Sequence, residues 1–112
     1  MTAVMKDENF FEHVWELTRQ IPAGRVTSYG AIAKALGTDN LSRMVAKAMG
    51  ACGNANPPVP YYRVVSSDGR LSGDPASAGK RQAMLEAEGV GVKALKVLNF
   101  KQVCWDPLKE LE

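Results

Sequence analysis

The sequence predicts a mainly α-helical domain with a small β wing, which is the winged helix-turn-helix class. Two helical patterns, over residues 29–36 and 41–50, are separated by a break at residues 37–40 (GTDN). A short glycine-containing turn between two helices is the helix-turn-helix arrangement. Two short runs, over residues 63–65 and 70–72, flank Ser-Ser-Asp-Gly and predict a hairpin of the kind that forms a wing.

The first helix is expected to run from Asp7, which can cap it, to about Gln20. Its apolar side follows helical spacing through Phe10, Phe11, Val14, Leu17 and Thr18, with Trp15 at the edge. The other side carries residues that we expect to be solvated rather than catalytic: Glu8, Glu12, Glu16 and Arg19, with His13 also exposed. A proline and a glycine at residues 21–24 (IPAG) then end the helix.

The second and third helices carry the most informative surface. Thr27 or Ser28 is expected to cap the second helix, from Tyr29 to Leu36, and Asn40 or Ser42 to start the third, from Leu41 to about Gly50. The third helix has Arg43 and Lys47 four residues apart, and several small residues: Ser42, Ala46, Ala48, Gly50 and Ala51. Small residues let a helix approach DNA closely, and an arginine there can contact phosphate or enter the base stack. Alanine is also simply a good helix former, so the composition leaves both interpretations open.

A rigid linker, residues 52–60, delivers the chain to the stretch PYYRVV at residues 60–65. Two neighbouring tyrosines in a strand would face opposite ways. After Pro60, a turn could instead present Tyr61 and Tyr62 to one pocket. Residues 77–79 (SAG) then lead into a fourth helix, Lys80 to Glu88, which Gly89 ends. The alternation over residues 90–105 predicts one or two terminal strands, and residues 106–112 form a tail.

Composition is that of one small domain covering residues 1–112. At 112 residues, 46% of them apolar, the chain can bury a core without disulfides. We expect a monomer. We expect it in the cytoplasm, because no signal peptide opens the sequence and no apolar run reaches the ~18 residues of a membrane span. Cys52 and Cys104 stand alone and His13 is the one histidine, so neither a zinc site nor a cofactor is expected.

Charge is unevenly placed along the chain. The formal net charge is +2, but residues 19–81 carry nine Lys and Arg against three Asp. A basic middle section suits a surface that meets a polyanion, although charge bias alone more often means solvated side chains.

Four motifs occur in order: IPxGxVxSYGxIA (21–33), RxVxxAM (43–49), VPxxRVV (59–65) and DGxLSG (68–73). Together they resemble the C-terminal domain of O6-alkylguanine-DNA alkyltransferases, over about residues 10–90. In those enzymes the central motif is Pro-Cys-His-Arg-Val, and its cysteine accepts the alkyl group. Here Tyr61 and Tyr62 stand at the cysteine and histidine positions. Together with the short chain and the helix start at residues 77–82 (SAGKRQ, with Ser77, Ala78, Gly79, Arg81 and Gln82), this looks like the alkyltransferase-like proteins, which are non-enzymatic relatives.

The chemistry agrees with a protein that is not an enzyme. Dealkylation needs a thiolate activated by a base. At the cysteine position, Tyr61 offers a phenol, whose ordinary pKa is ~10. At the position of the histidine, which would be the base, the chain has Tyr62. We interpret Cys52 and Cys104 as inert, since neither sits in the motif or beside a histidine.

The resemblance also implies a role for each matching residue. The second helix of the helix-turn-helix would enter the minor groove through Ser42, Arg43, Ala46 and Lys47, with Arg43 filling the gap left by a flipped base. Tyr29 would crowd the phosphate and help to rotate the nucleotide. Tyr61 would form the floor of a lesion pocket, to which Tyr62, Val64, Ser72 and Gly73 also belong. Arg63 and Glu88 would be structural, with Glu88 bonded to Tyr62.

Two departures from the family pattern affect lesion preference. The better-known alkyltransferase-like proteins keep the histidine that is Tyr62 here. They also place a basic residue after the Ser72 position, where this chain has Gly73-Asp74.

The resemblance therefore implies a protein that binds O6-alkylguanine in duplex DNA by base flipping, without alkyl transfer, and that marks it for nucleotide excision repair proteins, as its relatives do. One alternative is a sequence-specific winged-helix regulator, although the third helix offers few base-reading side chains beyond Arg43 and Lys47. A second alternative is residual methyltransferase activity through Cys52.

Overall fold

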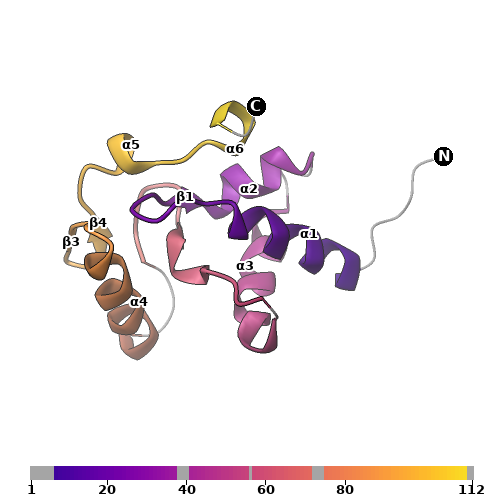
Figure 1. Ribbon diagram of the computed structural model, residues 1–112, viewed down its shortest axis with the longest axis horizontal. Coiled ribbons are helices and arrows are strands. Elements are labelled where there is room, and N and C mark those ends of the chain that lie inside the picture. Colours follow the sequence, from indigo (N-terminus) through magenta and orange to yellow (C-terminus); the bar gives the residue numbers. More distant parts are fainter. Residues whose placement is uncertain (1–6, 38–40, 56, 72–74, 111–112) are drawn as a thin grey trace.

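The computed structural model describes residues 7–37, 41–55, 57–71 and 75–110 (Figure 1). It confirms the predicted class, a mostly helical fold with very short strands. The elements in chain order are α1 (Asp7–Arg19), β1 (Thr27–Ser28), α2 (Tyr29–Ala35), α3 (Ser42–Gly50), the 3-10 turns η1 (Cys52–Asn54) and η2 (Tyr61–Arg63), β2 (Val64–Val65), α4 (Pro75–Ala87), β3 (Val92–Lys93), β4 (Lys96–Val97), α5 (Phe100–Val103) and α6 (Pro107–Glu110).

Helix α1 packs as its spacing predicts. Phe10, Val14 and Thr18 are buried at successive turns of one face, while His13 is exposed. At the edge of that face, Trp15 Nε1 donates to the Ala48 carbonyl of α3 at 2.8 Å. The aromatic side chain thus adds a directional bond to an apolar contact and sets how α3 lies against α1.

The helix-turn-helix pair has the predicted cap of α2, whereas the N-cap of α3 is Leu41, which makes no side-chain cap hydrogen bond. Ser28 is the N-cap of α2, and its Oγ accepts from the Ala31 N–H at 3.0 Å. Gly37 has a φ of +77°, which favours glycine just beyond a helix end. The inner face of α3 consists of Val45, Ala48 and Met49, all buried. Because this stripe is buried, the opposite face of α3 points to solvent.

The wing differs from the predicted hairpin in its pairing. The chain does reverse at residues 66–70, where the Gly69 N–H donates to the Ser66 carbonyl at 2.8 Å. Strand β2, however, pairs in parallel with β1, Thr27 opposite Val64 and Ser28 opposite Val65. Both residues of β2 are fully buried and apolar, so they lie beside another buried strand rather than an exposed return strand. Arg70 instead bridges to Lys96 of β4.

The fourth helix begins at Pro75, earlier than the predicted Lys80. Proline suits the first position of a helix, because its φ is already helical and its missing N–H would have no partner there. Buried Ala78 then draws residues 77–79 into the helix, although Gly79 weakens it.

The C-terminal region forms two strands, as predicted, followed by a helix that was not. Strands β3 and β4 pair antiparallel around Ala94 and Leu95, which both have positive φ. Helix α5 follows because Phe100 and Val103, three residues apart, share one face against the core. The chain then runs beside Val26, whose carbonyl accepts from the Trp105 N–H at 2.6 Å. A further short helix, α6, occupies part of the predicted tail.

Two apolar clusters meet at β2. Val64 belongs to the cluster around α1, α2 and α3, whereas Val65 belongs to the cluster that includes α4, β3 and β4. Successive residues of a strand face opposite ways, so β2 packs into both clusters at once. The η2 turn, immediately before β2, is therefore positioned by both halves of the core. Within the described parts of the chain, no helix is long and apolar enough to cross a membrane.

Candidate functional site

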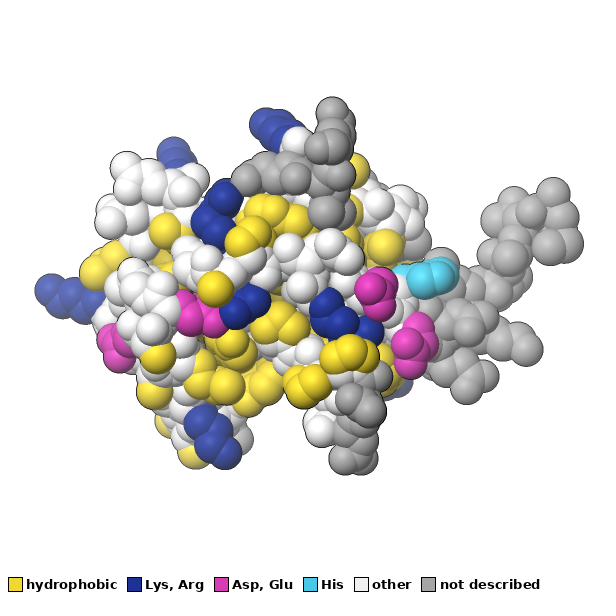
Figure 2. Space-filling view, in the orientation of Figure 1, with side chains coloured by type: hydrophobic (Ala, Val, Ile, Leu, Met, Phe, Trp, Pro, Cys, Tyr) yellow, Lys and Arg dark blue, Asp and Glu magenta, His cyan; other side chains and the backbone are white. Residues whose placement is uncertain are grey.

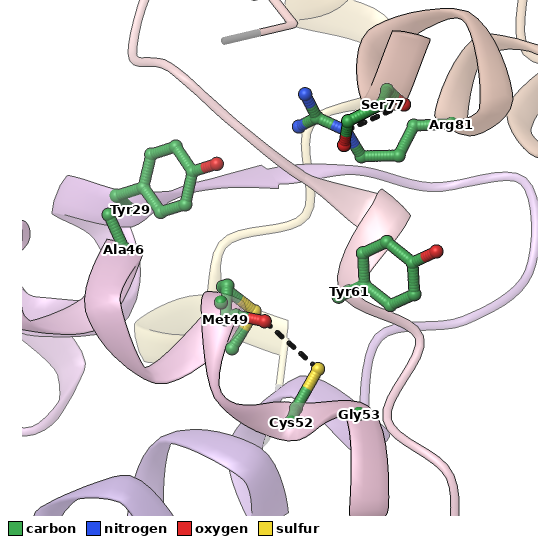
Figure 3. A pocket seen from close by; sticks show the side chains of 9 residues that line it. Tyr29, Ala46, Met49, Cys52, Gly53, Tyr61, Ser77 and Arg81 are labelled. Carbon is green, nitrogen blue, oxygen red and sulfur yellow. Dashed lines mark hydrogen bonds between the residues drawn. The ribbon is translucent and has the colours of Figure 1, made fainter. Parts of the chain in front are cut away.

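A cavity of about 490 Å³ opens between α2, α3, η2 and α4 (Figure 3). It brings together three of the residues predicted from the sequence, Tyr29, Ala46 and Tyr61. Each comes from a different element, so the fold and not the local chain creates the site. The full lining is Tyr29, Ala46, Met49, Gly50, Cys52, Gly53, Tyr61, Ser77 and Arg81.

The outward face of α3 lies beside this cavity. Arg43, Ala46, Lys47 and Gly50 are exposed, and Ser42 is half-buried. Ala46 and Gly50 belong both to this face and to the cavity wall. A ligand that lies along α3 therefore has direct access to the cavity, because no large side chain of α3 stands between them.

The η2 turn places its two tyrosines in different surroundings. The Arg63 N–H donates to the Pro60 carbonyl at 3.0 Å, which closes a turn straight after the proline. The two rings meet edge to face, with centroids 6.0 Å apart and planes at 81°. Tyr61 lines the cavity, whereas Tyr62 lies outside its lining. Both rings line a second hollow, of about 510 Å³, with residues 57–60, Arg19, Arg63 and Met84, so Tyr61 lies between the two spaces.

The other predicted pocket residues are placed differently. The side chain of Val64 is fully buried in the core, so it can contribute only backbone groups. The Tyr61 carbonyl accepts from the Val64 N–H within the turn. A carbonyl has a second lone pair, so this bond leaves one acceptor position on Tyr61. Ser72, Gly73 and Asp74 lie outside the described residues.

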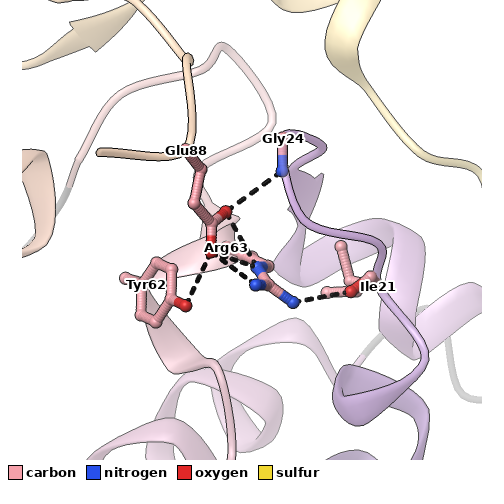
Figure 4. Close-up of polar contacts among 5 residues, drawn as sticks. All are labelled: Ile21, Gly24, Tyr62, Arg63 and Glu88. Atoms are coloured by element: carbon pink, nitrogen blue, oxygen red, sulfur yellow. Dashed lines mark hydrogen bonds and ion pairs between the residues drawn. The ribbon is translucent and has the colours of Figure 1, made fainter. Parts of the chain in front are cut away.

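Glu88, at the end of α4, supports the turn from behind (Figure 4). Tyr62 Oη donates to Glu88 Oε2 at 2.8 Å, which is the hydrogen bond predicted from the sequence. Arg63 forms an ion pair with the same carboxylate, through Nη2 and through Nε at 3.0 Å, which fits the structural role expected for it. Arg63 Nη1 also donates to the Ile21 carbonyl at 2.8 Å, and the Gly24 N–H donates to Glu88 Oε1 at 3.1 Å. One carboxylate therefore holds η2 to the segment that follows α1.

The network shifts the ionisation of its members. Burial disfavours the charged form of Glu88, but the hydrogen bonds from Arg63, Gly24 and Tyr62 outweigh it and lower the pKa of the carboxyl. Burial and the neighbouring Glu88 raise the pKa of Tyr62. Tyr62 therefore remains a neutral hydrogen-bond donor at neutral pH, and it cannot act as the base that the family's histidine provides.

Arg81 lines the cavity but was not predicted as a site residue. Its guanidinium lines the cavity although the residue is only 6% exposed, and its Nε lies 3.4 Å from the Ser77 carbonyl. A signal was present: Arg81 stands three residues after buried Ala78 and four before buried Leu85. A cation on the apolar stripe of a helix is unusual enough to mark a site.

Cys52 also lines the cavity, which its isolation in the sequence did not indicate. Its thiol is buried and donates to the Met49 carbonyl at 3.1 Å. Burial raises the pKa of the thiol, so the reactive thiolate is disfavoured. In the described ranges, no group of three or more His, Cys, Asp or Glu side chains could hold a metal ion.

Comparisons with known proteins give a consistent result. A family model described as the 6-O-methylguanine DNA methyltransferase DNA-binding domain matches residues 9–90. A DNA base-flipping protein of Vibrio parahaemolyticus is 31% identical over 100 residues, which cover 89% of this chain and 99% of that protein. Alkyltransferase-like protein 1 of Schizosaccharomyces pombe is 32% identical over 109 residues, which cover 92% of this chain and all of that protein.

Comparison with solved structures gives the same family. The crystal structure of S. pombe Atl1 in complex with damaged DNA containing O6-carboxymethylguanine matches with a TM-score of 0.79 and 33% sequence identity. The match covers 92% of this chain and 100% of that one.

Proposed function

The chain belongs to the family of the 6-O-methylguanine DNA methyltransferase DNA-binding domain, and from this we propose that it binds O6-alkylguanine in duplex DNA by flipping the base, without removing the alkyl group. One observation carries the proposal. A cavity walled by Tyr61, at the position of the family's acceptor cysteine, opens beside the exposed cationic face of α3.

The DNA would lie along α3. Ala46 and Gly50 leave room for a close approach to the minor groove, and Lys47 extends from the same face toward phosphates. Arg43 fills the space that the flipped base leaves in the stack, and Ser42 contacts the backbone at the start of the helix. Tyr29, at the start of α2, lies at the cavity and presses on the phosphate of the rotating nucleotide.

The flipped base would occupy the cavity. Extrusion costs a few kcal/mol, and it costs least for a poorly paired base, as an O6-alkylated guanine is. Tyr61 contacts the alkyl group where a thiol would attack it. The second lone pair of the Tyr61 carbonyl is available to the guanine amino group, together with the backbone of Val64. Ser72 and Gly73 complete the pocket in this proposal, with Tyr62 holding its floor through Glu88.

No alkyl transfer is expected, for three chemical reasons. Tyr61 is a phenol, Tyr62 is hydrogen-bonded to Glu88 and cannot serve as a base, and the Cys52 thiol is held in its protonated form by burial. The bound complex would then mark the lesion for nucleotide excision repair in the cytoplasm or nucleoid. The family resemblance is what supports this last step.

Competitive binding at fixed salt tests the proposal. One duplex carries O6-methylguanine and its twin carries guanine at the same position. We expect preferential binding to the modified duplex, and no methyl group on the protein by intact-mass measurement. Equal affinity for the two duplexes would contradict the proposal and leave a sequence-specific winged-helix regulator as the better description.

Residual transfer to Cys52 is the second candidate, because this thiol lines the cavity. It predicts one methyl group per protein chain after incubation with methylated duplex, and the loss of that mass shift in Cys52→Ser. We expect no mass shift in either protein. In Cys52→Ser the preference for the modified duplex should remain, since the thiol bonds only to the Met49 carbonyl among the described residues.

A further inference from the structure

Arg81 is a buried cation at the wall of a cavity. The residue is 6% exposed, and its neighbours on the same stripe of α4, Ala78 and Leu85, are fully buried. The next residue back, Lys80, has the same charge but is exposed. The charge of Arg81 is therefore held at the cavity by the fold, whereas that of Lys80 lies in solvent.

The position of Arg81 suits the recognition of a ligand inside the cavity. Figure 3 shows its guanidinium beside Ser77, on the side of the cavity where the rings of Tyr29 and Tyr61 flank the space. Nε lies 3.4 Å from the Ser77 carbonyl, which orients the planar group. A guanidinium presents several N–H donors in one plane, a geometry that matches a carboxylate through two parallel bonds.

Among the described residues that line the cavity, Arg81 is the one with a charged side chain. The remainder of the lining is aromatic, aliphatic, glycine, a hydroxyl and a thiol. A buried guanidinium is less exposed to water and salt than a surface lysine, so it distinguishes an anionic ligand from a neutral one more strongly.

We propose that Arg81 sets the adduct preference of the cavity, favouring O6-substituents that end in a carboxylate over neutral ones of similar size. The inference rests on the proposed function, since it assumes that an O6-alkylguanine enters this cavity. The methyl group of O6-methylguanine reaches no partner on Arg81, whereas the carboxylate of a carboxymethyl group pairs with the guanidinium. A cavity of about 490 Å³ is within the range of small-ligand sites and has room for the longer substituent.

The test compares four duplexes of one sequence at fixed salt and neutral pH. They carry guanine, O6-methylguanine, O6-carboxymethylguanine or O6-carbamoylmethylguanine, the last being the neutral amide of nearly the same shape. With the unaltered protein, we expect the carboxylate to bind about tenfold more tightly than the amide, the usual scale of a charge-assisted bond. This comparison needs no variant and so does not depend on one that folds.

Variants then assign the effect to the residue. Arg81→Gln should remove the tenfold difference between carboxylate and amide. Arg81→Lys should keep part of it, because the charge remains but the paired geometry is lost. Lys80→Gln removes the same charge at the neighbouring, exposed position and should leave the ratio unchanged.

The outcomes separate the two proposals. If the unaltered protein binds all four duplexes alike, the proposed function is wrong. If it prefers every alkylated duplex over guanine but treats carboxylate and amide equally, the adduct inference alone is overturned. An Arg81→Gln protein that melts like the unaltered one and retains the full difference would equally overturn it.

Discussion

Glu88 accepts hydrogen bonds from three residues in two separate parts of the chain: Tyr62 and Arg63 of η2, and the Gly24 N–H. The side chains of Arg63 and Glu88 are 15% and 14% exposed, so their ion pair is mostly shielded from water. This ion pair holds the η2 turn in place. Because Tyr61 belongs to that turn, the ion pair also positions Tyr61 at the cavity.

Glu88→Gln should destabilise the fold by about 2 to 4 kcal/mol, because Arg63 would remain as a largely buried cation without its counter-charge. Urea unfolding at neutral pH measures this loss. Glu86→Gln is the matched control: Glu86 is exposed on the same helix, where it accepts from Gln82 at 3.2 Å, and its change should stay within about 0.5 kcal/mol. Equal effects of the two substitutions would mean that the network contributes little.

The lowered pKa of Glu88 also predicts how stability depends on pH. In the unfolded chain a glutamate titrates near ~4.3. A carboxyl whose pKa is lower in the folded state stabilises the fold fully above that value, and loses this contribution as pH falls through the folded pKa. The stability difference between the unaltered protein and Glu88→Gln should therefore be largest at neutral pH and shrink below about pH 4. Urea unfolding at several pH values tests this, and a constant difference would contradict it.

At the scale of elements, the parallel pair β1–β2 contains a buried hydroxyl. Thr27 is fully buried, and among the described residues its Oγ1 has no hydrogen-bond partner. Thr27→Val keeps the shape and removes the polar atom, so it should raise stability by about 1 kcal/mol. Thr18→Val is the contrasting control, because Thr18 Oγ1 donates to the Val14 carbonyl at 2.6 Å. We expect thermal unfolding to show a gain for the first and a small loss for the second; a loss for Thr27→Val would reveal a partner such as a bound water.

The pairing of β2 illustrates what the sequence could not predict. Helices α1, α2 and α3 follow local signals, namely periodic apolar residues, the Ser28 cap and Gly37, and they were predicted within a residue or two. Strand β2 is two residues long and finds its partner, β1, far back in the chain, so no local pattern reports the pairing. The residues that line the cavity likewise include some that local motifs predicted and some that they did not. The motif residues Tyr29, Ala46 and Tyr61 were predicted. Ser77 was missed because the start of α4 was placed too late, and Arg81 because its place on the buried stripe between Ala78 and Leu85 was not recognised.

Helix α3 allows the roles of its two cations to be distinguished. Arg43 and Lys47 are both exposed on the outward face, one turn apart. If Arg43 fills the stack after flipping, Arg43→Ala should reduce affinity for the O6-methylguanine duplex about tenfold more than affinity for the guanine duplex. Lys47→Ala should weaken both by the same modest factor, as the loss of a phosphate contact does. Titration of both duplexes with each variant measures this, and equal losses for Arg43→Ala would make it an ordinary phosphate contact.

At the scale of the whole molecule, charge and cavity contribute separately to binding. Figure 2 shows one face on which hydrophobic side chains gather between α4 and α3, with Lys and Arg side chains among and around them. The net charge is only +2, so attraction to DNA depends on where the cations lie and not on their sum. In the proposed function the cavity, in contrast, would recognise the base through contacts that salt does not screen.

This separation predicts two different salt dependences. Each phosphate neutralised contributes about −0.9 to the slope of log affinity against log salt, so the phosphate contact of Lys47 alone should weaken binding about threefold to fourfold between roughly 50 and 200 mM salt. The ratio of affinities for O6-methylguanine and guanine duplexes should change by less than about twofold over the same range, because both duplexes release the same counterions. Anisotropy titrations of the two duplexes at several salt concentrations measure both quantities. A preference that vanished as salt increased would place lesion recognition on the charged face of α3, and a preference that persisted would place it in the cavity lined by Tyr61.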